Sequence, residues 1–125
     1  MSRKEKTPGH LGSKKTERYI QASILLSLLS RPSYGYELIQ EISRFGFMEG
    51  QVPPGMIYRH LRELEENGLL FSEWETDGAG PAKRIYQLTA EGMEVLGFWI
   101  EYMKKQAEKL LQFVDMYQDG IKEKE

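Results

Sequence analysis

The chain has 125 residues, a net charge of −2 and no cysteine, and its pI is near 5.8. This length suits one domain plus an appendage, and a hydrophobic share of 40% is enough for a modest core. No apolar run is long enough to cross a membrane, and the N-terminus lacks the apolar segment of a signal peptide. Without cysteine the chain has neither disulfides nor thiolate metal sites, so we expect a cytoplasmic protein without a cofactor.

Residues 1–15 contain Pro8, two glycines and several lysines, with no periodic apolar pattern. We expect a disordered basic arm, which either strengthens nucleic-acid binding through phosphate contacts or only keeps the chain in solution. The acidic overall balance argues against a nucleic-acid-binding protein. Against it stands the uneven distribution of charge, because only Glu5 and Glu17 oppose the basic residues before Tyr19. These are Arg3, Lys4, Lys6, Lys14, Lys15 and Arg18.

Two helices are predicted between residues 16 and 45. The first spans residues 16–29 and ends before Pro32, because the residue that precedes a proline disfavours helix. Ser33 is expected to cap the second, which runs to about Phe45. A turn over residues 46–51 follows. The inward-facing positions are Ile20, Ile24, Leu25, Leu28, Leu29, Leu38, Ile39 and Ile42.

A third helix is predicted from Pro54 to the Asn67-Gly68 pair. Pro53 and Pro54 lack the backbone donors that a helix start would leave unpaired, and Asn-Gly tolerates the backbone of a helix end. Apolar residues recur at spacings of four and three, which places Ile57, Leu61 and Leu64 on one face. The opposite face carries Met56, Arg59, His60 and Glu63, flanked by Tyr58 and Arg62. An ordinary amphipathic surface helix has the same period, but arginines near the N-terminal half also suit insertion into the DNA major groove.

Two strand patterns follow, over residues 69–74 and 83–88, separated by the turn formers of residues 77–81. The sequence therefore predicts a β-hairpin with Gly80 at its tip and two cations, Lys83 and Arg84, on the returning strand. Alone, these would be solvated charges. Directly after a recognition helix, such a hairpin is typical of the wing of a winged helix-turn-helix, which contacts phosphates or the minor groove.

The last predicted helix begins after Thr89 and runs to about Gln118. Apolar residues alternate at steps of three and four, as in a heptad seam. A seam of this length exceeds what a small domain can cover, so we expect pairing with a second copy, which would also place two recognition helices about 34 Å apart. A helix that folds back on its own domain is the alternative. The seam residues are Met93, Leu96, Ile100, Met103, Ala107, Leu110, Val114 and Tyr117.

Three motifs resemble the PadR family of bacterial transcriptional regulators: YGYELIQEI, PPGMIYRHLRELEENGLL and GAGPAKRIYQLTAEG. The resemblance covers about residues 20–92 and looks like the compact subtype with one helix after the wing. It implies a mainly α fold with a small β-hairpin, divided into an arm (1–15), a winged helix-turn-helix domain (16–88), a C-terminal dimerisation helix (89–120) and a tail (121–125). It also implies a dimeric repressor that binds a palindromic operator in double-stranded DNA.

The same resemblance implies DNA contacts and an effector site. Tyr36 would contact phosphate, with core packing as its alternative role. Where the family has a hydroxyl residue before the helix-starting proline and after the glycine, this chain has Pro53 and Met56, so a cap and a phosphate contact are missing. Some relatives bind planar aromatic ligands beside the last helix, a role for which Trp99, Phe98 and Tyr102 are candidates besides core packing. The expected DNA-binding residues are Tyr36, Pro54, Gly55, Met56, Tyr58, Arg59, His60, Arg62, Gly80, Lys83 and Arg84.

The residues also bear on two other classes of function. An enzyme is disfavoured, because the only histidines are His10 and His60, no nucleophile is paired with a base, and no P-loop or dinucleotide pattern occurs. We expect His60 to face DNA or solvent. A protein-interaction adaptor built on a winged helix remains open, since the acidic balance permits it.

Overall fold

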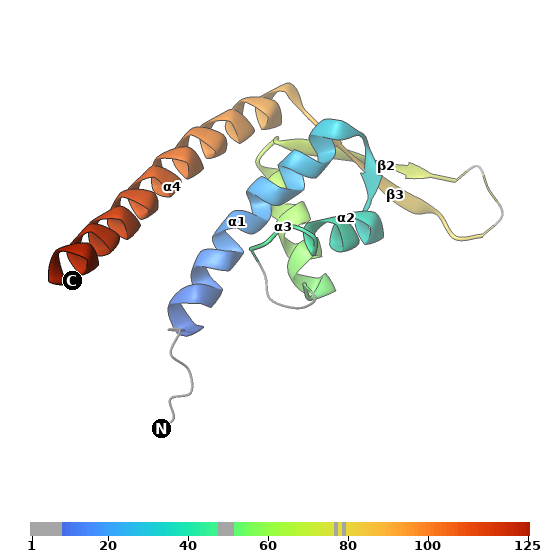
Figure 1. Cartoon of the computed structure of the whole chain (residues 1–125). Coiled ribbons are helices and arrows are strands. Elements are labelled where there is room, and N and C mark those ends of the chain that lie inside the picture. Colours follow the sequence, from blue (N-terminus) through green and yellow to red (C-terminus); the bar gives the residue numbers. More distant parts are fainter. Residues whose placement is uncertain (1–8, 48–51, 77, 79) are drawn as a thin grey trace.

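The computed structural model describes residues 9–47, 52–76, 78 and 80–125. Within them the chain forms seven elements, which are α1 (Gly9–Ser30), β1 (Ser33–Tyr34), α2 (Gly35–Ile42), α3 (Pro54–Glu66), β2 (Leu70–Glu75), β3 (Lys83–Leu88) and α4 (Ala90–Lys124). The strands form one antiparallel sheet in the order β1-β3-β2. Figure 1 shows α1, α2 and α3 gathered at the centre, with the β2–β3 hairpin projecting to one side and α4 running away on the other.

The core lies where the first three helices meet the sheet. The predicted apolar faces of α1, α2 and α3 are confirmed at most positions, and Tyr86 from β3 and Leu96 from α4 close the cluster. The prediction that Leu29 faces the core is wrong, because this side chain is 48% exposed. Leu26, on the same helix, is also exposed, at 42%. Among the described residues, the fully enclosed apolar side chains are Ile20, Ile24, Leu25, Leu38, Ile42, Val52, Ile57, Leu61, Leu64 and Leu70.

The N-terminal helix is longer than predicted. It begins at Gly9, not at residue 16, so residues 9–15 of the expected disordered arm are helical. Residues 1–8 of that arm, residues 48–51 of the predicted turn, and Asp77 and Ala79 of the hairpin tip lie outside the described residues. The polar composition of residues 9–15 gave no periodic signal, and helix continues through such a segment when it extends an already formed helix.

A two-residue strand, β1, was not predicted. Ser33 pairs with Tyr86, and Tyr34 pairs with Ile85, so this segment adds a third strand beside β3. Ser33 therefore does not cap α2 as expected; Tyr34 precedes the helix, and its backbone N–H donates to Glu37 Oε1 at 3.0 Å. The strand ties the start of α2 to the base of the hairpin.

Both ends of α3 and the start of α4 follow the predicted signals. Pro53 precedes α3 and Asn67 ends it, with Gly68 at φ +78°. Thr89 caps α4, because its Oγ1 accepts from Gly92 N at 2.9 Å and donates to the Gly68 carbonyl at 2.8 Å. A Cβ on Gly92 would lie 2.0 Å from the carbonyl oxygen of Leu69. The helix therefore begins in direct contact with the backbone that leads into β2.

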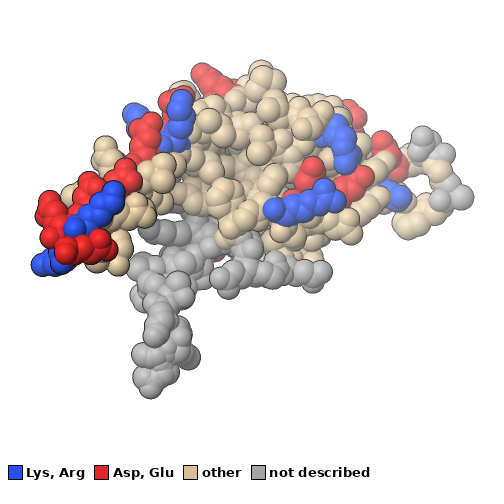
Figure 2. Space-filling model, viewed as in Figure 1, with Lys and Arg blue, Asp and Glu red and all other residues tan. Residues whose placement is uncertain are grey.

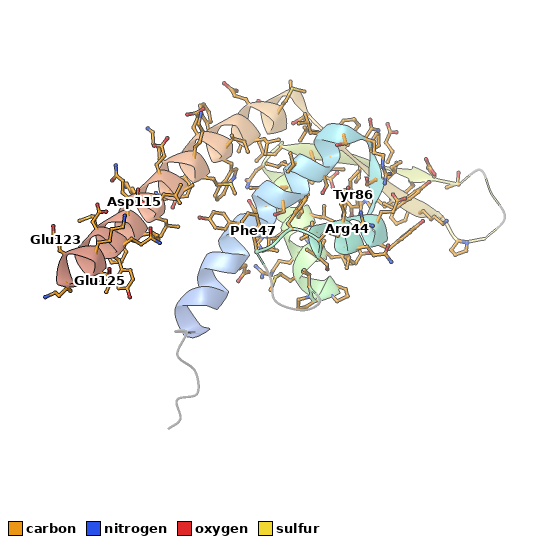
Figure 3. All side chains as sticks on the ribbon, in the orientation of Figure 1. Arg44, Phe47, Tyr86, Asp115, Glu123 and Glu125 are labelled. Carbon is orange, nitrogen blue, oxygen red and sulfur yellow. The ribbon has the colours of Figure 1, made fainter. Side chains whose placement is uncertain are left out.

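The long helix leaves the domain after its first turns. Leu96 is 5% exposed and belongs to the domain's own core, whereas Leu110 is 68% and Tyr117 is 65% exposed. The helix continues to Lys124, past the predicted end at residue 118 and through most of the expected tail. In Figure 3 the side chains around Asp115, Glu123 and Glu125 stand off the ribbon far from every other described element.

Three packed helices, a hairpin and a flanking small strand make up a winged-helix fold, followed by one long helix. The predicted fold class, mainly α with a small β-hairpin, is thus confirmed, with β1 as an addition. None of the helices in the described parts of the chain combines the length and apolarity that a membrane crossing needs.

Candidate nucleic-acid interface

The outer face of α3 carries the exposed residues Gly55, Tyr58, Arg59 and Arg62. This agrees with the helical period, because the buried residues of α3 occupy the opposite side. Met56 differs from the prediction. It is half-buried and packs against the core, so it lies at the edge of this face.

Arg59 lies on the edge of α3 that faces α1, where it forms an ion pair with Glu17. A second carboxylate, Glu63, lies 3.9 Å from the guanidinium. The Arg59 hydrogen bond holds the pKa of Glu17 below its usual value, and Glu17 in turn raises the pKa of Arg59. Arg59 is therefore exposed but engaged, and a ligand must compete with Glu17 for it.

His60 does not face solvent as predicted. Its residue is 6% exposed, and Gln21 Nε2 on α1 donates to its Nδ1 at 3.0 Å. Because an amide nitrogen only donates, Nδ1 accepts this hydrogen bond. The other ring nitrogen, Nε2, is 3.3 Å from Glu17 Oε2, without hydrogen-bond geometry. His60 joins α1 to α3, and its burial removes it from the candidate contact surface.

Tyr58 lies on the other edge of α3, against the start of α2. A Cβ on Gly35 would lie 2.6 Å from Tyr58 Cε1, so only glycine lets the tyrosine ring approach this closely. The close packing at Gly35 is therefore against α3. It fixes the ring of Tyr58 between α2 and the hairpin.

The cations of the wing are each held by aromatic rings. Lys83 Nζ lies 5.5 Å from the ring centre of Tyr34 and 6.0 Å from that of Tyr36, and these two rings stack at 5.6 Å. The Tyr34 hydroxyl donates to Glu75, which raises the pKa of Tyr34 to about 12. Tyr36 itself is 51% exposed. Lys83 is itself exposed above these rings, so it remains accessible to an anionic partner.

Arg84 is held by a different set. Its guanidinium carbon lies 5.1 Å from the centre of the Trp74 ring, and its Nε donates to Ser72 Oγ at 2.8 Å. Ser72 Oγ in turn donates to Glu65 of α3 at 2.9 Å. Arg84 is therefore connected to the end of the candidate recognition helix.

Two adjoining hollows lie between α3 and the wing. The first has a volume of about 450 Å³, and the second, of about 370 Å³, shares Tyr58, Arg84 and Tyr86 with it. Tyr86, labelled in Figure 3, forms their buried floor, and burial raises its pKa. Arg62 lines the first hollow and Lys83 the second, so cations from both the helix and the wing border this space. Glu65 and Glu66 also border the first hollow.

Charges are unevenly distributed over the surface. On the face drawn in Figure 2, charged side chains gather along α4 and toward the wing, with acidic and basic groups intermixed, while the centre carries few. Although the net charge of the chain is −2, α3 and the wing carry the exposed cations Arg59, Arg62, Lys83 and Arg84.

The aromatic residues predicted as an effector site lie together on α4. Val95, Phe98, Trp99 and Tyr102 line a shallow hollow of about 320 Å³. Trp99 also packs against the core and contacts Tyr19 of α1 edge-on, with ring centres 6.1 Å apart. Trp99 therefore serves core packing on one side and borders an open apolar surface on the other.

The predicted contact residues thus fall into groups. Tyr36, Tyr58, Lys83 and Arg84 border the hollow between α2, α3 and the wing; Arg62 borders its neighbour. Arg59 lies apart toward α1, Pro54 and Gly55 are exposed at the start of α3, and Gly80 is exposed at the hairpin tip with φ +109°. Sequence reasoning missed Glu17, Tyr34, Glu65, Ser72 and Trp74. The alternation of β2 placed Ser72 and Trp74 on one face, which was the available signal.

Residues 24–97 match the Transcriptional regulator PadR-like family. The transcriptional regulator Rv3488 of Mycobacterium tuberculosis is 36% identical over 77 residues, which are 62% of this chain and 68% of that protein. A transcriptional regulator from Clostridium thermocellum has a similar structure, with a TM-score of 0.72 at 24% identity over 82% of this chain and 96% of that chain.

The structure of Bacillus subtilis PadR in complex with operator DNA is also similar, with a TM-score of 0.59 and 23% identity. The match covers 66% of this chain and 46% of that one. At this identity the likeness shows a shared fold. Since the family match spans more than half of the sequence, the chain belongs to the PadR-like family of transcriptional regulators.

Proposed function

We propose that this protein is a transcriptional regulator that binds double-stranded DNA through α3 and the β2–β3 wing. The observation that carries the proposal is the placement of Arg59, Arg62, Lys83 and Arg84. All four are exposed, and they come from the two elements that in a winged helix meet the major groove and the neighbouring backbone. The similar Bacillus subtilis protein was solved with operator DNA, which supports the same use of the shared fold.

The protein acts on DNA as a homodimer in this proposal. Apolar side chains on α4 beyond residue 109 are 43–72% exposed, and a helix of 35 residues gains little stability without a partner. A second copy would cover them and would duplicate α3 for a palindromic operator. Leu96 is excluded from this seam because it faces the domain's own core. The proposed seam residues are Met93, Ile100, Met103, Ala107, Leu110, Val114 and Tyr117.

The proposal extends to repression and to release by a small effector. Binding to an operator blocks transcription when the operator overlaps a promoter. A planar aromatic ligand stacked on Trp99, near Phe98 and Tyr102, would shift the arrangement of α4. The hollow at these residues supports such a ligand. Saturable quenching of tryptophan fluorescence by planar aromatic compounds, lost in Trp99→Phe, is expected; quenching that persists unchanged in that variant would remove this part of the proposal.

No catalytic role is proposed. A bacterial-type regulator of this kind acts in the cytoplasm, where the DNA is. The alternative is an adaptor that uses the winged helix to bind another protein, which the acidic balance and the Glu17–Arg59 pair favour.

The test is a gel-shift titration with the Arg59→Ala/Lys83→Ala double variant. We expect weaker binding to duplex DNA, while size-exclusion chromatography still shows the dimer. The matched control is Lys105→Ala/Lys109→Ala, which removes the same charge from the side of α4 opposite the seam. Equal affinity of the first variant and the wild type for DNA would favour the adaptor.

A further inference from the structure

We propose that Trp74, Ser72 and Glu65 are positioning residues that hold the guanidinium of Arg84 toward the space between α3 and the wing, where it meets a DNA phosphate. The proposal rests on the proposed function and deepens it, because it adds three residues that make no necessary contact with DNA themselves. It also says how the recognition helix and the wing act together.

The first support of Arg84 is Trp74. The two residues are directly opposite each other in the β2–β3 register, and the guanidinium lies over the indole ring. Trp74 is 58% exposed and contributes little to the core. A planar guanidinium stacks well on an indole, which restricts the orientation of the arginine without burying its charge.

The second support is a relay of hydrogen bonds from Arg84 to α3. The Ser72 hydroxyl accepts from Arg84 Nε and donates its single proton to Glu65, so both of its roles are filled. The backbone N–H of Ser72 also donates to Glu65 Oε2 at 3.2 Å. Because β2 is an edge strand of the sheet, this carboxylate occupies an outward-facing donor of the strand. Glu65 thereby sets the position of the wing relative to α3.

These contacts leave one edge of the guanidinium for a ligand. The relay uses Nε, and among the described residues the terminal nitrogens of Arg84 have no hydrogen-bond acceptor. The terminal nitrogens carry N–H groups in a fixed fork, which fits two oxygens of one phosphate. An arginine already fixed by stacking and by Nε loses less side-chain freedom on binding than a free one does.

Glu65 offers a test in which the two explanations predict opposite signs. An acidic group near DNA that acted only by its charge would repel phosphates, so its removal would strengthen binding. If Glu65 positions Arg84, then Glu65→Ala weakens binding. Glu66→Ala is the matched control, because Glu66 is the exposed neighbour on the same helix and takes no part in the relay.

Affinity for a duplex that the wild type binds would be measured by fluorescence anisotropy, with thermal unfolding as a check on folding. Trp74→Leu should weaken binding roughly two- to five-fold, the range expected for an exposed cation–π contact, and Trp74→Phe should weaken it less. Arg84→Ala should weaken it about tenfold or more, as for the loss of a charged hydrogen bond. Trp74→Leu combined with Arg84→Ala should bind no worse than Arg84→Ala alone.

The salt dependence of binding distinguishes the loss of a positioning contact from the loss of a charge. Arg84→Ala should reduce the slope of log affinity against log salt by about one per phosphate contact, whereas Trp74→Leu should leave the slope unchanged. Additive losses in the Trp74 and Arg84 variants, or tighter binding by Glu65→Ala, would overturn the positioning role. Failure of the wild type to bind any duplex would instead overturn the proposed function, so the two failures are distinguishable.

Discussion

Replacing Gly92 by alanine tests how α4 is joined to the winged domain. The added Cβ would lie 2.0 Å from the Leu69 carbonyl oxygen and 2.7 Å from Leu88 Cδ1. The oxygen belongs to backbone and cannot rotate away, so the start of α4 must shift. Such overpacking costs about 1–3 kcal/mol or more, against which alanine gains about 1 kcal/mol over glycine inside a helix. A contact of 2.0 Å lies far inside van der Waals separation, so the cost falls at the upper end of this range, and we expect a net loss of about 2 kcal/mol in the free energy of unfolding.

Gly97 provides the control on the same helix. A Cβ there meets nothing within 4 Å, so Gly97→Ala should raise stability by about 0.5–1 kcal/mol. Urea unfolding followed by circular dichroism, at one protein concentration because a dimer's stability depends on it, measures both variants. A Gly92→Ala protein as stable as the wild type would refute the close contact between α4 and the backbone before β2.

Three further predictions concern the ion pair and the long helix. Glu17→Gln should tighten DNA binding, because Arg59 would no longer have to break its ion pair with Glu17 before it binds a phosphate. Unchanged affinity in a gel shift would place Arg59 outside the interface. The folded-state pKa of Glu17 is lowered from 4.5, so its stabilising effect is complete above that value and is lost as pH falls through the lowered pKa. Wild type and Glu17→Gln should therefore converge in stability in acid, and a difference that persists there would contradict this. Leu110→Asp should dissociate the dimer in analytical ultracentrifugation while the winged domain stays folded, whereas Lys109→Asp, on the opposite side of the helix from the seam, should not.

Periodicity and boundary signals predicted most of the fold. The spacing of Ile57, Leu61 and Leu64 predicted the apolar face of α3, because burial there follows the helical period. The position of Thr89 before the last helix predicted an N-cap, and its side chain accepts the hydrogen bond that such a cap requires. The strand β1 was not predictable in the same way. A strand of two residues is too short to show the alternation of apolar and polar residues, and Ser33 is as typical of a helix cap as of a strand.

The sequence predicted the cations of the candidate site, but it did not predict which residues contact them. His60 shows why, because its position on the helix is at the border between the two faces, and only the arrival of Gln21 and Glu17 from α1 decides that it is buried. The stacking of Arg84 on Trp74 depends on strand register, which a five-residue tip of turn formers does not define. Leu96 fits the heptad seam by spacing, yet α4 packs against α1 here, which places this side chain in the domain's own core.

The most direct test of the central claim is selection of bound sequences from random duplex DNA by the full chain, at two salt concentrations. We expect enrichment of a palindromic site whose halves are about one helical turn apart, with affinity that falls steeply as salt rises. Weak association at low salt without any enriched sequence would contradict the claim that this protein reads DNA.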